Sequence, residues 1–335
     1  MFLFFSIIGT LLLFFHSWRY HKPKITIYFF LFSTTFGLFK QYYIHYFYLV
    51  EPKPFVFLHT GEFKLFGINP VETIGWNFAF YLSYFLAEQI LSRLGMIKHY
   101  VTPVVILGAL ICTTISFCME ITGIATGMWQ WNARVTFDIP YILSQGLLAR
   151  PIINWATKCA MFLFGFSIFT SPLFNKWTGK ILCLFVFFWH FILFRLVHIS
   201  SDTSFNIFYF TLLILFIYLP LEKNFFIDKT AHDWTTNILA YAAAMLMIIF
   251  IAVKLIANGH PELLISILPL LLFIILSIKE LPFSLFIFLS IISAFLFWGK
   301  ANLNFVILPF ASLLIMRLRS RLLRYQHLNF IRIKA

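Results

Sequence analysis

Residues 102–123 read TPVVILGALICTTISFCMEITG, a long apolar run that indicates the fold class of the chain. Glu120 is its single charged residue, and its length matches the roughly 20 predominantly apolar residues that a helix needs to cross a bilayer. The whole chain has the same character, since 61% of its 335 residues are hydrophobic, 11% are charged and the mean hydropathy is +0.90. These proportions lie far outside the range of soluble domains. The sequence therefore predicts an all-α, polytopic integral membrane protein.

Similar apolar runs recur between polar or proline-bearing connectors. They predict about eleven membrane spans, or about ten if two of the last three merge across their very short connectors. The expected spans lie near residues 2–16, 25–49, 71–90, 102–123, 151–170, 180–199, 205–221, 236–255, 262–278, 282–298 and 303–316. Residues 1–16 are interpreted as a span rather than a signal peptide, because no small-residue cleavage site follows. Residues 1–316 would form a single transmembrane helical domain, and residues 317–335 a basic tail.

Lys and Arg residues set the expected orientation. The formal net charge is +13, and the cations gather near residues 19–24, 93–98 and 176–180 and in the tail. Cytoplasmic connectors carry an excess of Lys and Arg, so these segments are expected in the cytoplasm. An odd number of spans then places the amino terminus outside and the tail inside, in what we expect to be a bacterial inner membrane. The bilayer is the expected partner, whereas nucleic acid is not, because no basic groove is interleaved with aromatic residues.

The same topology places two long connectors, residues 50–70 and 124–150, on the outer side. Both are rich in aromatic residues, and the second holds Trp129, Trp131 and Arg134. Connectors of this length usually carry a function or fold back over the bundle, so we expect the chemistry on this side. No CxxC pair, no HxxxH or HExxH spacing, no P-loop and no Rossmann fingerprint occurs, so neither a metal nor a soluble cofactor is expected.

Ionisable residues inside the apolar runs mark a candidate site, because such a side chain in lipid must face protein, water or a partner. Glu120 is the most informative, since it closes a very apolar run. Gly123 and Gly127 follow at helical spacing, so a groove beside the carboxylate would lack bulk and admit a flat, apolar ligand. Alternatively, Glu120 reaches the outer interface and the glycines serve packing alone. The other ionisable residues of this kind are Lys40, Glu72, Glu88, Lys158, His190, Arg195 and His198.

Glu72 opens the third expected span, and Trp76 lies one turn later on the same face. A carboxylate at that position would also simply complement the positive end of the helix. The third span runs inward from Glu72 and the fourth runs outward to Glu120, so we expect both carboxylates at the same depth in one pocket. Two carboxylates close together cannot both stay charged, which would leave one as an acid and the other as a base. Glu88 is interpreted as a structural ion pair with Arg93.

Arg195, His198 and Asp202 form one stripe on the sixth expected span. We expect His198 and Asp202 within hydrogen-bonding reach of one another and open to the outer side. Such a pair can shuttle a proton or contribute to a metal site, although a metal would need further ligands. A hydrogen-bonded structural triad is the alternative.

The segment MEITGIATGMWQWN, residues 119–132, resembles a signature of the membrane-bound carotenoid biosynthesis proteins. That family contains the acyclic carotenoid hydratases of the bisanhydrobacterioruberin type. The resemblance covers roughly residues 102–160. The positions that match in order are Glu120, Gly123, Thr126, Gly127, Trp129 and Trp131, followed by Pro151 with Trp155.

This resemblance implies chemistry on a long polyene held in the bilayer. Hydration of an end-group double bond needs an acid to protonate carbon, an aromatic wall to stabilise the cation and a base to activate water. The expected parts are, in that order, Glu120; Trp76, Trp129 and Trp131; and either Glu72 or the pair His198 and Asp202. The expected substrate contacts also include Gly123, Gly127, Arg134 and Trp155. A cyclase or an isomerase would use the same parts, and a non-catalytic membrane carrier of a small molecule is the alternative.

Overall fold

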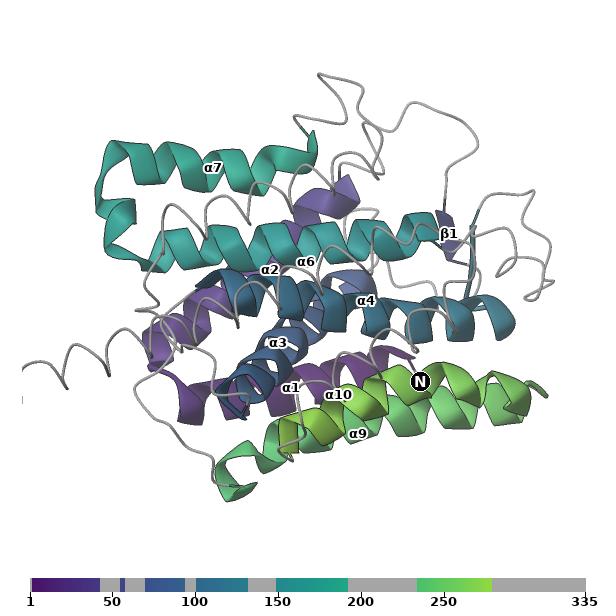
Figure 1. Cartoon of the computed structure of the whole chain (residues 1–335). Coiled ribbons are helices and arrows are strands. Elements are labelled where there is room, and N and C mark those ends of the chain that lie inside the picture. The colour runs from purple at the N-terminus through teal and green to yellow at the C-terminus, as the bar shows by residue number, and fades with distance from the viewer. Residues whose placement is uncertain are drawn as a thin grey trace, which may run out of the picture.

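The computed structural model describes residues 2–42, 55–57, 70–93, 101–131, 149–191 and 234–278. These residues form a bundle of helices with one small sheet (Figure 1). The helices are α1 (Phe2–Tyr20), α2 (Pro23–Tyr42), α3 (Pro70–Arg93), α4 (Val101–Ala125), α6 (Ala149–Thr170), α7 (Trp177–Phe191), α9 (Trp234–Ala257) and α10 (Leu268–Ile278), with the 3-10 helices η2 (Pro172–Asn175) and η4 (Pro261–Ile267). The sheet pairs strand β1 (Phe55–Phe57) with strand β2 (Trp129–Trp131).

Helices occupy the expected spans wherever these fall on described residues. The predicted all-α class is confirmed for this part of the chain, with the short sheet as its departure. Three segments among the described residues are long and apolar enough to cross a membrane, namely Pro103–Ala125, Asn237–Ala257 and Pro261–Ile278. They indicate an integral membrane protein. The count of eleven spans stays a prediction, because the spans expected near 205–221, 282–298 and 303–316 lie outside the described residues.

Helix α4 is enclosed by its neighbours along nearly its whole length, as is much of α3. In the most apolar part of α4, 94% of the residues are buried. The value is 44% for α9 and also 44% for the span formed by η4 and α10. A helix that is hydrophobic all round is stable where protein surrounds it, whereas a helix at the edge needs one face toward its neighbours. Helices α3 and α6 provide most of the cover of α4.

The outer helices expose apolar stripes rather than polar ones. On α1 the exposed side chains recur every three or four residues, and the same is seen along much of α9. Residues at this spacing share one face of a helix. Polar side chains such as His16, Asn77 and Glu88 are instead buried. This distribution suits a bundle surrounded by lipid, in which buried polar groups must find partners inside the protein. The exposed residues are Phe4, Ile7, Leu11, Phe15 and Trp18 on α1, and Ile238, Met245, Ile249, Val253 and Ile256 on α9.

Close packing of α4 against α6 depends on Gly108. A Cβ atom at this position would lie 2.7 Å from Cδ1 of Leu163, closer than side chains tolerate. The Cys159 thiol donates to the Gly108 carbonyl across the same contact, at 3.7 Å. Small residues at such crossings let helices approach closely, which is a main source of attraction between helices in lipid.

Opposite ends of the bundle have different constructions. One end, which we call the ribbon end, holds the antiparallel pair of β1 and β2. In the chain, β1 precedes α3 and β2 follows α4. The other end holds the α1–α2 turn and η2, and we call it the basic end because it carries Arg19, Lys22, Lys24, Lys176 and Lys180. Figure 1 shows β1 at the right and η2, before α7, at the left. Residues 55–57 and 129–131, one strand from each of the two long connectors, therefore lie side by side, whereas the side of the membrane stays a prediction.

Candidate functional site

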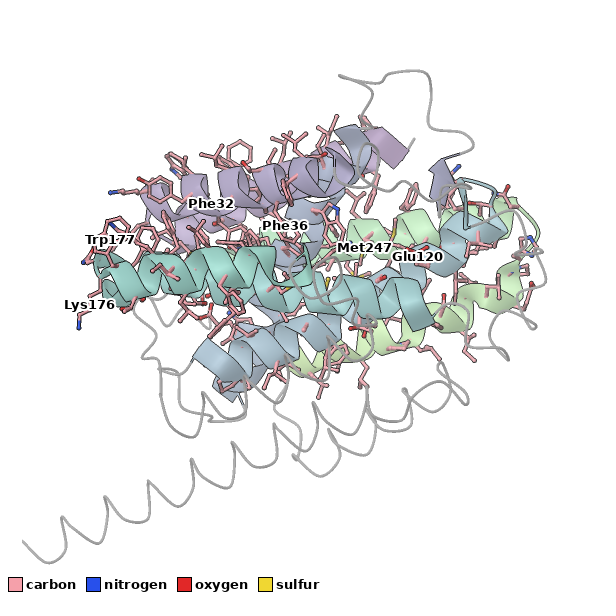
Figure 2. The ribbon with its side chains drawn as sticks, turned by 90° about the horizontal axis from the view of Figure 1, so that it is seen from above. Phe32, Phe36, Glu120, Lys176, Trp177 and Met247 are labelled. Atoms are coloured by element: carbon pink, nitrogen blue, oxygen red, sulfur yellow. The ribbon has the colours of Figure 1, made fainter. Side chains whose placement is uncertain are left out.

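Glu120 lies in the last turns of α4, at the ribbon end of the bundle. Its side chain is only 2% exposed, although it is ionisable and the surrounding span is apolar. Figure 2 shows it in the half of the bundle away from Lys176 and Trp177. The predicted intramembrane carboxyl group is therefore enclosed by protein. The alternative, in which Glu120 reaches the interface, does not fit this burial.

Gly127 terminates α4 instead of continuing its face. The helix ends at Ala125, and Gly127 has a φ of 63°, in the left-handed region that favours glycine. The Met128 amide donates to the Gly123 carbonyl at 2.8 Å, and the Gly127 amide donates to the Ile124 carbonyl at 3.2 Å, the paired bonds of a Schellman cap. The expected helical stripe from Glu120 through Gly127 is therefore wrong beyond Gly123, because the left-handed residue turns the chain into β2.

The turn at Gly127 places Trp129 and Trp131 in the two-stranded sheet of β1 and β2. Trp129 and Trp131 are the first and last residues of β2, opposite Phe57 and Phe55 of β1. This pairing ties the segment before α3 to the segment after α4. The start of α3, which contains Glu72, and the end of α4, which contains Glu120, therefore lie at the same end of the bundle.

Trp76 lies in the core between α2, α3 and α6. Its side chain is fully buried, and its ring centroid is 5.0 Å from that of Phe80 and 6.5 Å from that of Phe36. The Lys158 ammonium group, from α6, lies 5.7 Å from the Trp76 ring centroid in a cation–π contact. Lys158 is only 6% exposed. The sequence marked it as an ionisable residue in a span, and its aromatic partner emerges only from the fold.

Several predicted site residues lie wholly or partly outside the described part of the chain. The side chains of Glu72, Trp129, Trp131 and Trp155 lie outside the described residues, although their backbones belong to α3, β2 and α6. Arg134, His198 and Asp202 lie outside them entirely. The convergence of Glu72 with Glu120 and the hydrogen bond between His198 and Asp202 therefore stay predictions.

A buried polar cluster that the sequence analysis missed joins α1, α3 and α9. Its centre is His16, which is fully buried. The Nδ1 atom of His16 lies 2.9 Å from the Tyr81 hydroxyl oxygen, and Nε2 lies 3.2 Å from Oδ1 of Asn237. Both ring nitrogens therefore have hydrogen-bond partners, each from a different helix. A sequence signal existed in His16 and Tyr20, which lie one turn apart at the end of an apolar run.

The same cluster extends along α3 toward the basic end. Tyr84 donates to Oε2 of Glu88 at 2.7 Å, and Nε2 of Gln89 donates to the Tyr20 hydroxyl at 3.3 Å. Tyr81, Tyr84 and Glu88 lie on one stripe of α3, at the spacing of residues that share a helix face. Hydrogen bonds between buried polar groups are stronger in a low-dielectric interior than in water, so they help to fix how these helices pack.

Arg93 fastens the end of α3 to α10. Its Nε donates to the Ser277 carbonyl at 2.6 Å, and the Tyr241 hydroxyl donates to the same carbonyl at 3.1 Å. A cation near the last turn of a helix also interacts favourably with its negative end. The predicted ion pair of Arg93 with Glu88 is not among these contacts and stays a prediction.

The described residues contain no group of three or more His, Cys, Asp or Glu side chains that could hold a metal ion. Comparison of the chain with protein-family models, with curated protein sequences and with solved structures finds no match in any of the three.

Proposed function

We propose that this protein is an integral membrane enzyme of carotenoid or related isoprenoid-lipid metabolism, which adds water to a polyene end group by acid–base chemistry. The observation that supports it best is the burial of the Glu120 carboxyl group in α4, the most buried of the three candidate spans among the described residues. A carboxyl group held among apolar side chains can reach a double bond that never leaves the bilayer. Ionisable residues kept within membrane spans are retained at a cost, and they mark functional sites by default.

The proposed reaction needs no oxidant, reductant or soluble cofactor. The protonated carboxyl of Glu120 gives its proton to one carbon of the double bond, and the neighbouring carbon becomes a cation. A base, Glu72 or the pair His198 and Asp202, takes one proton from a water molecule as the water oxygen bonds to that cation. The proton then returns to Glu120, so the net change is the addition of one water. Attack by a second double bond of the polyene, followed by proton loss, would give cyclisation from the same cation.

In this proposal the aromatic residues of β2, rather than Trp76, stabilise the cation that forms on the substrate. The Lys158 ammonium group already lies over the Trp76 ring, at 5.7 Å from its centroid. A positive charge developing on the substrate would be repelled by this ammonium group, so Trp76 is better suited to holding Lys158 than to stabilising the cation. Trp129 and Trp131 follow the Gly127 turn, and we assign the stabilising role to them.

Co-expression with a polyene-producing pathway tests the proposal. Extracted pigments from cells with the wild-type protein are expected to include a product heavier than the polyene by one water molecule. Glu120→Gln is expected to remove this product without lowering the amount of membrane-inserted protein, because glutamine keeps the volume but cannot donate a proton to carbon. Glu262→Gln, at an exposed position near the start of η4, is the control and should leave the product unchanged.

An unchanged pigment profile with well-inserted wild-type protein would count against hydration. In that case an isomer or a cyclised product of unchanged mass, separated by chromatography, would retain the acid–base site but change the reaction. If neither appears, the carrier interpretation is favoured. Uptake of a labelled polyene into proteoliposomes is then the next measurement.

A further inference from the structure

We infer that Ser116 and Glu120, which lie one turn apart on α4, together hold a single water molecule inside the bundle. This water would be the one that is added to the polyene, a role that rests on the proposed function. Ser116 would then position the water for its attack on the substrate.

The Ser116 hydroxyl differs from the other described hydroxyl groups of α4. Four threonines of this helix donate to the backbone carbonyl four residues earlier, at 2.7 to 3.1 Å, namely Thr113, Thr114, Thr122 and Thr126. Serine also makes this bond in the bundle, since Ser167 of α6 donates to the Leu163 carbonyl at 2.5 Å. Ser116 is fully buried, yet its Oγ atom has no hydrogen-bond partner among the described residues. A buried hydroxyl group without a partner is costly, so a small polar ligand that reaches Ser116 would be bound favourably.

Ser116 and Glu120 share one face of α4. The Cys118 thiol, which lies between them in sequence, donates to the Ser266 carbonyl at 3.0 Å and so marks the face that packs on η4. At 3.6 residues per turn, Ser116 and Glu120 each lie about 160° around the helix from Cys118 and about 40° from one another. Both side chains therefore point away from η4. Long side chains on a helix lean back over the residue four positions earlier, which places the Glu120 side chain over Ser116.

A water molecule suits this position. A buried water makes about three hydrogen bonds to buried polar groups. The Ser116 hydroxyl offers both a donor and an acceptor, and a carboxyl group has two oxygen atoms, so one oxygen of Glu120 can hold the water while the other serves a protein neighbour. The adjoining residues of α4, Ile115, Phe117 and Met119, are buried and apolar, so they offer no further side-chain partners to a larger polar ligand.

In the proposed hydration this water lies beside the acid that starts the reaction. Once Glu120 has given its proton to one carbon, the water oxygen bonds to the neighbouring carbon, and the base takes one proton from the water. Ser116 gives up no proton in this sequence. Its oxygen accepts a hydrogen bond from the water, which turns a lone pair of the water toward the cation. Without this hydrogen bond, the same cation is left to lose a proton or to cyclise.

Infrared spectroscopy of the full-length protein in detergent tests the water site without turnover. The C=O stretching band of the protonated Glu120 carboxyl group is identified by its loss in Glu120→Gln. Ser116→Ala is expected to move this band to higher frequency, because the carboxyl group loses a hydrogen bond. In the wild type, exchange into H₂¹⁸O should also shift the O–H stretching band of the bound water, and this band should be missing from Ser116→Ala.

Ser83→Ala is the matched control for these spectra. Ser83 is as fully buried as Ser116, but its carbonyl lies beside Gly108, about three turns of α4 away from Glu120. Both bands should therefore be unchanged in this variant. Alanine removes only one oxygen atom and has a high helix propensity, so both variants are expected to fold. Their thermal melting in detergent checks this.

Product composition in the polyene co-expression experiment gives the second measurement. Ser116→Ala is expected to lower the hydrated product by about tenfold, the effect of losing one hydrogen bond to the reacting water. Products of unchanged mass, which arise from the same cation without water, should rise in proportion. Glu120→Gln should remove both classes of product. A merely structural role for Ser116 would lower both classes together.

Unchanged infrared bands in Ser116→Ala, or an equal shift in Ser83→Ala, would overturn the inference. A shifted carboxyl band without a band sensitive to H₂¹⁸O would indicate direct contact between Ser116 and Glu120, and would overturn it too. If the bands change as expected while wild-type cells make no hydrated product, the water site stands and the proposed hydration fails. If Ser116→Ala makes the hydrated product in the wild-type proportion, the hydration stands and the role of Ser116 in it is wrong.

Discussion

Glu120 and Glu88 are two buried carboxyl groups in one bundle, and their surroundings differ. Glu88 is 4% exposed, accepts a hydrogen bond from Tyr84 and belongs to a polar cluster that joins several helices. Glu120 is 2% exposed, lies near the end of an apolar helix and is followed by a glycine cap and an aromatic strand. Burial alone therefore does not distinguish the structural role of Glu88 from the catalytic role that we propose for Glu120. The two carboxyl groups differ in position, since Glu88 belongs to the polar cluster and Glu120 lies at the ribbon end.

The largest expected effect is on turnover. Glu120→Gln should lower product formation by about 10²–10⁴-fold, the usual range for loss of a general acid. Glu88→Gln keeps an acceptor for Tyr84 and should leave product formation per folded molecule near the wild-type level. Pigment yield normalised to inserted protein measures both. Equal losses in the two variants would show that the comparison between these carboxyl groups is mistaken.

The next largest effect concerns the polar cluster around His16. His16→Leu would remove a hydrogen-bond partner from both the Tyr81 hydroxyl and the Asn237 amide inside the bundle. We expect a loss of roughly 1–3 kcal/mol in the free energy of unfolding, because two hydrogen bonds are lost and each contributes about 0.5–1.5 kcal/mol. Thermal melting in detergent is the measurement. Adding Tyr81→Phe should recover part of the loss, and a purely additive double variant would contradict a direct interaction.

Adding one methyl group at Gly108, between α4 and α6, is expected to lower the stability of the bundle. Gly108→Ala would bring its Cβ within 2.7 Å of Leu163, so a loss of about 1–3 kcal/mol in unfolding free energy is expected from overpacking. Gly75→Ala is the matched control, because a Cβ there meets nothing within 4 Å. It should stabilise α3 slightly, since alanine restricts the unfolded chain. Leu163→Ala should relieve the clash at Gly108→Ala, and melting temperatures of the three variants test this.

The smallest effect compares two glycines at helix ends. Gly127 ends α4 with a φ of 63°, and Gly259 follows α9 with a φ of 80°. Alanine at either position should cost about 1–2 kcal/mol, since a left-handed backbone places Cβ too near the following carbonyl. The two variants should melt at similar temperatures. Only Gly127→Ala is expected to lower turnover, because the turn at Gly127 sets the position of β2. Equal turnover in the two variants would show that β2 is not part of the proposed site.

Composition and hydrophobic runs were sufficient to predict most of the described fold. The expected spans near 71–90, 102–123 and 236–255 agree with α3, α4 and α9, because a run of apolar residues in lipid can satisfy its backbone only as a helix. The short sheet was not predicted, since β1 and β2 are three residues each and their pairing joins segments far apart in the chain. Pairing between such distant segments leaves no local pattern.

Some features of the candidate site were likewise predicted from the sequence, and others emerged only from the fold. Glu120 was identified from sequence, because a charged residue in an apolar run is conspicuous wherever the helices lie. The proximity of Lys158 to Trp76 was not, because the two residues lie on different helices whose rotations are set by packing. Gly127 was read as part of a helical stripe, although its left-handed conformation ends the helix. The stripe of Tyr81, Tyr84 and Glu88 was visible in principle, since its spacing is helical.

The sequence by itself determined the solvent of this protein, the helical class of its spans and the identity of its intramembrane acids. These properties follow from local composition, because each apolar residue contributes independently to the cost of leaving lipid. Only the tertiary structure decided which helix is enclosed, which polar side chains meet and which ends of the helices share a face of the bundle. Helix rotation and register depend on contacts such as Gly108 with Leu163 and His16 with Tyr81, which join residues remote in sequence.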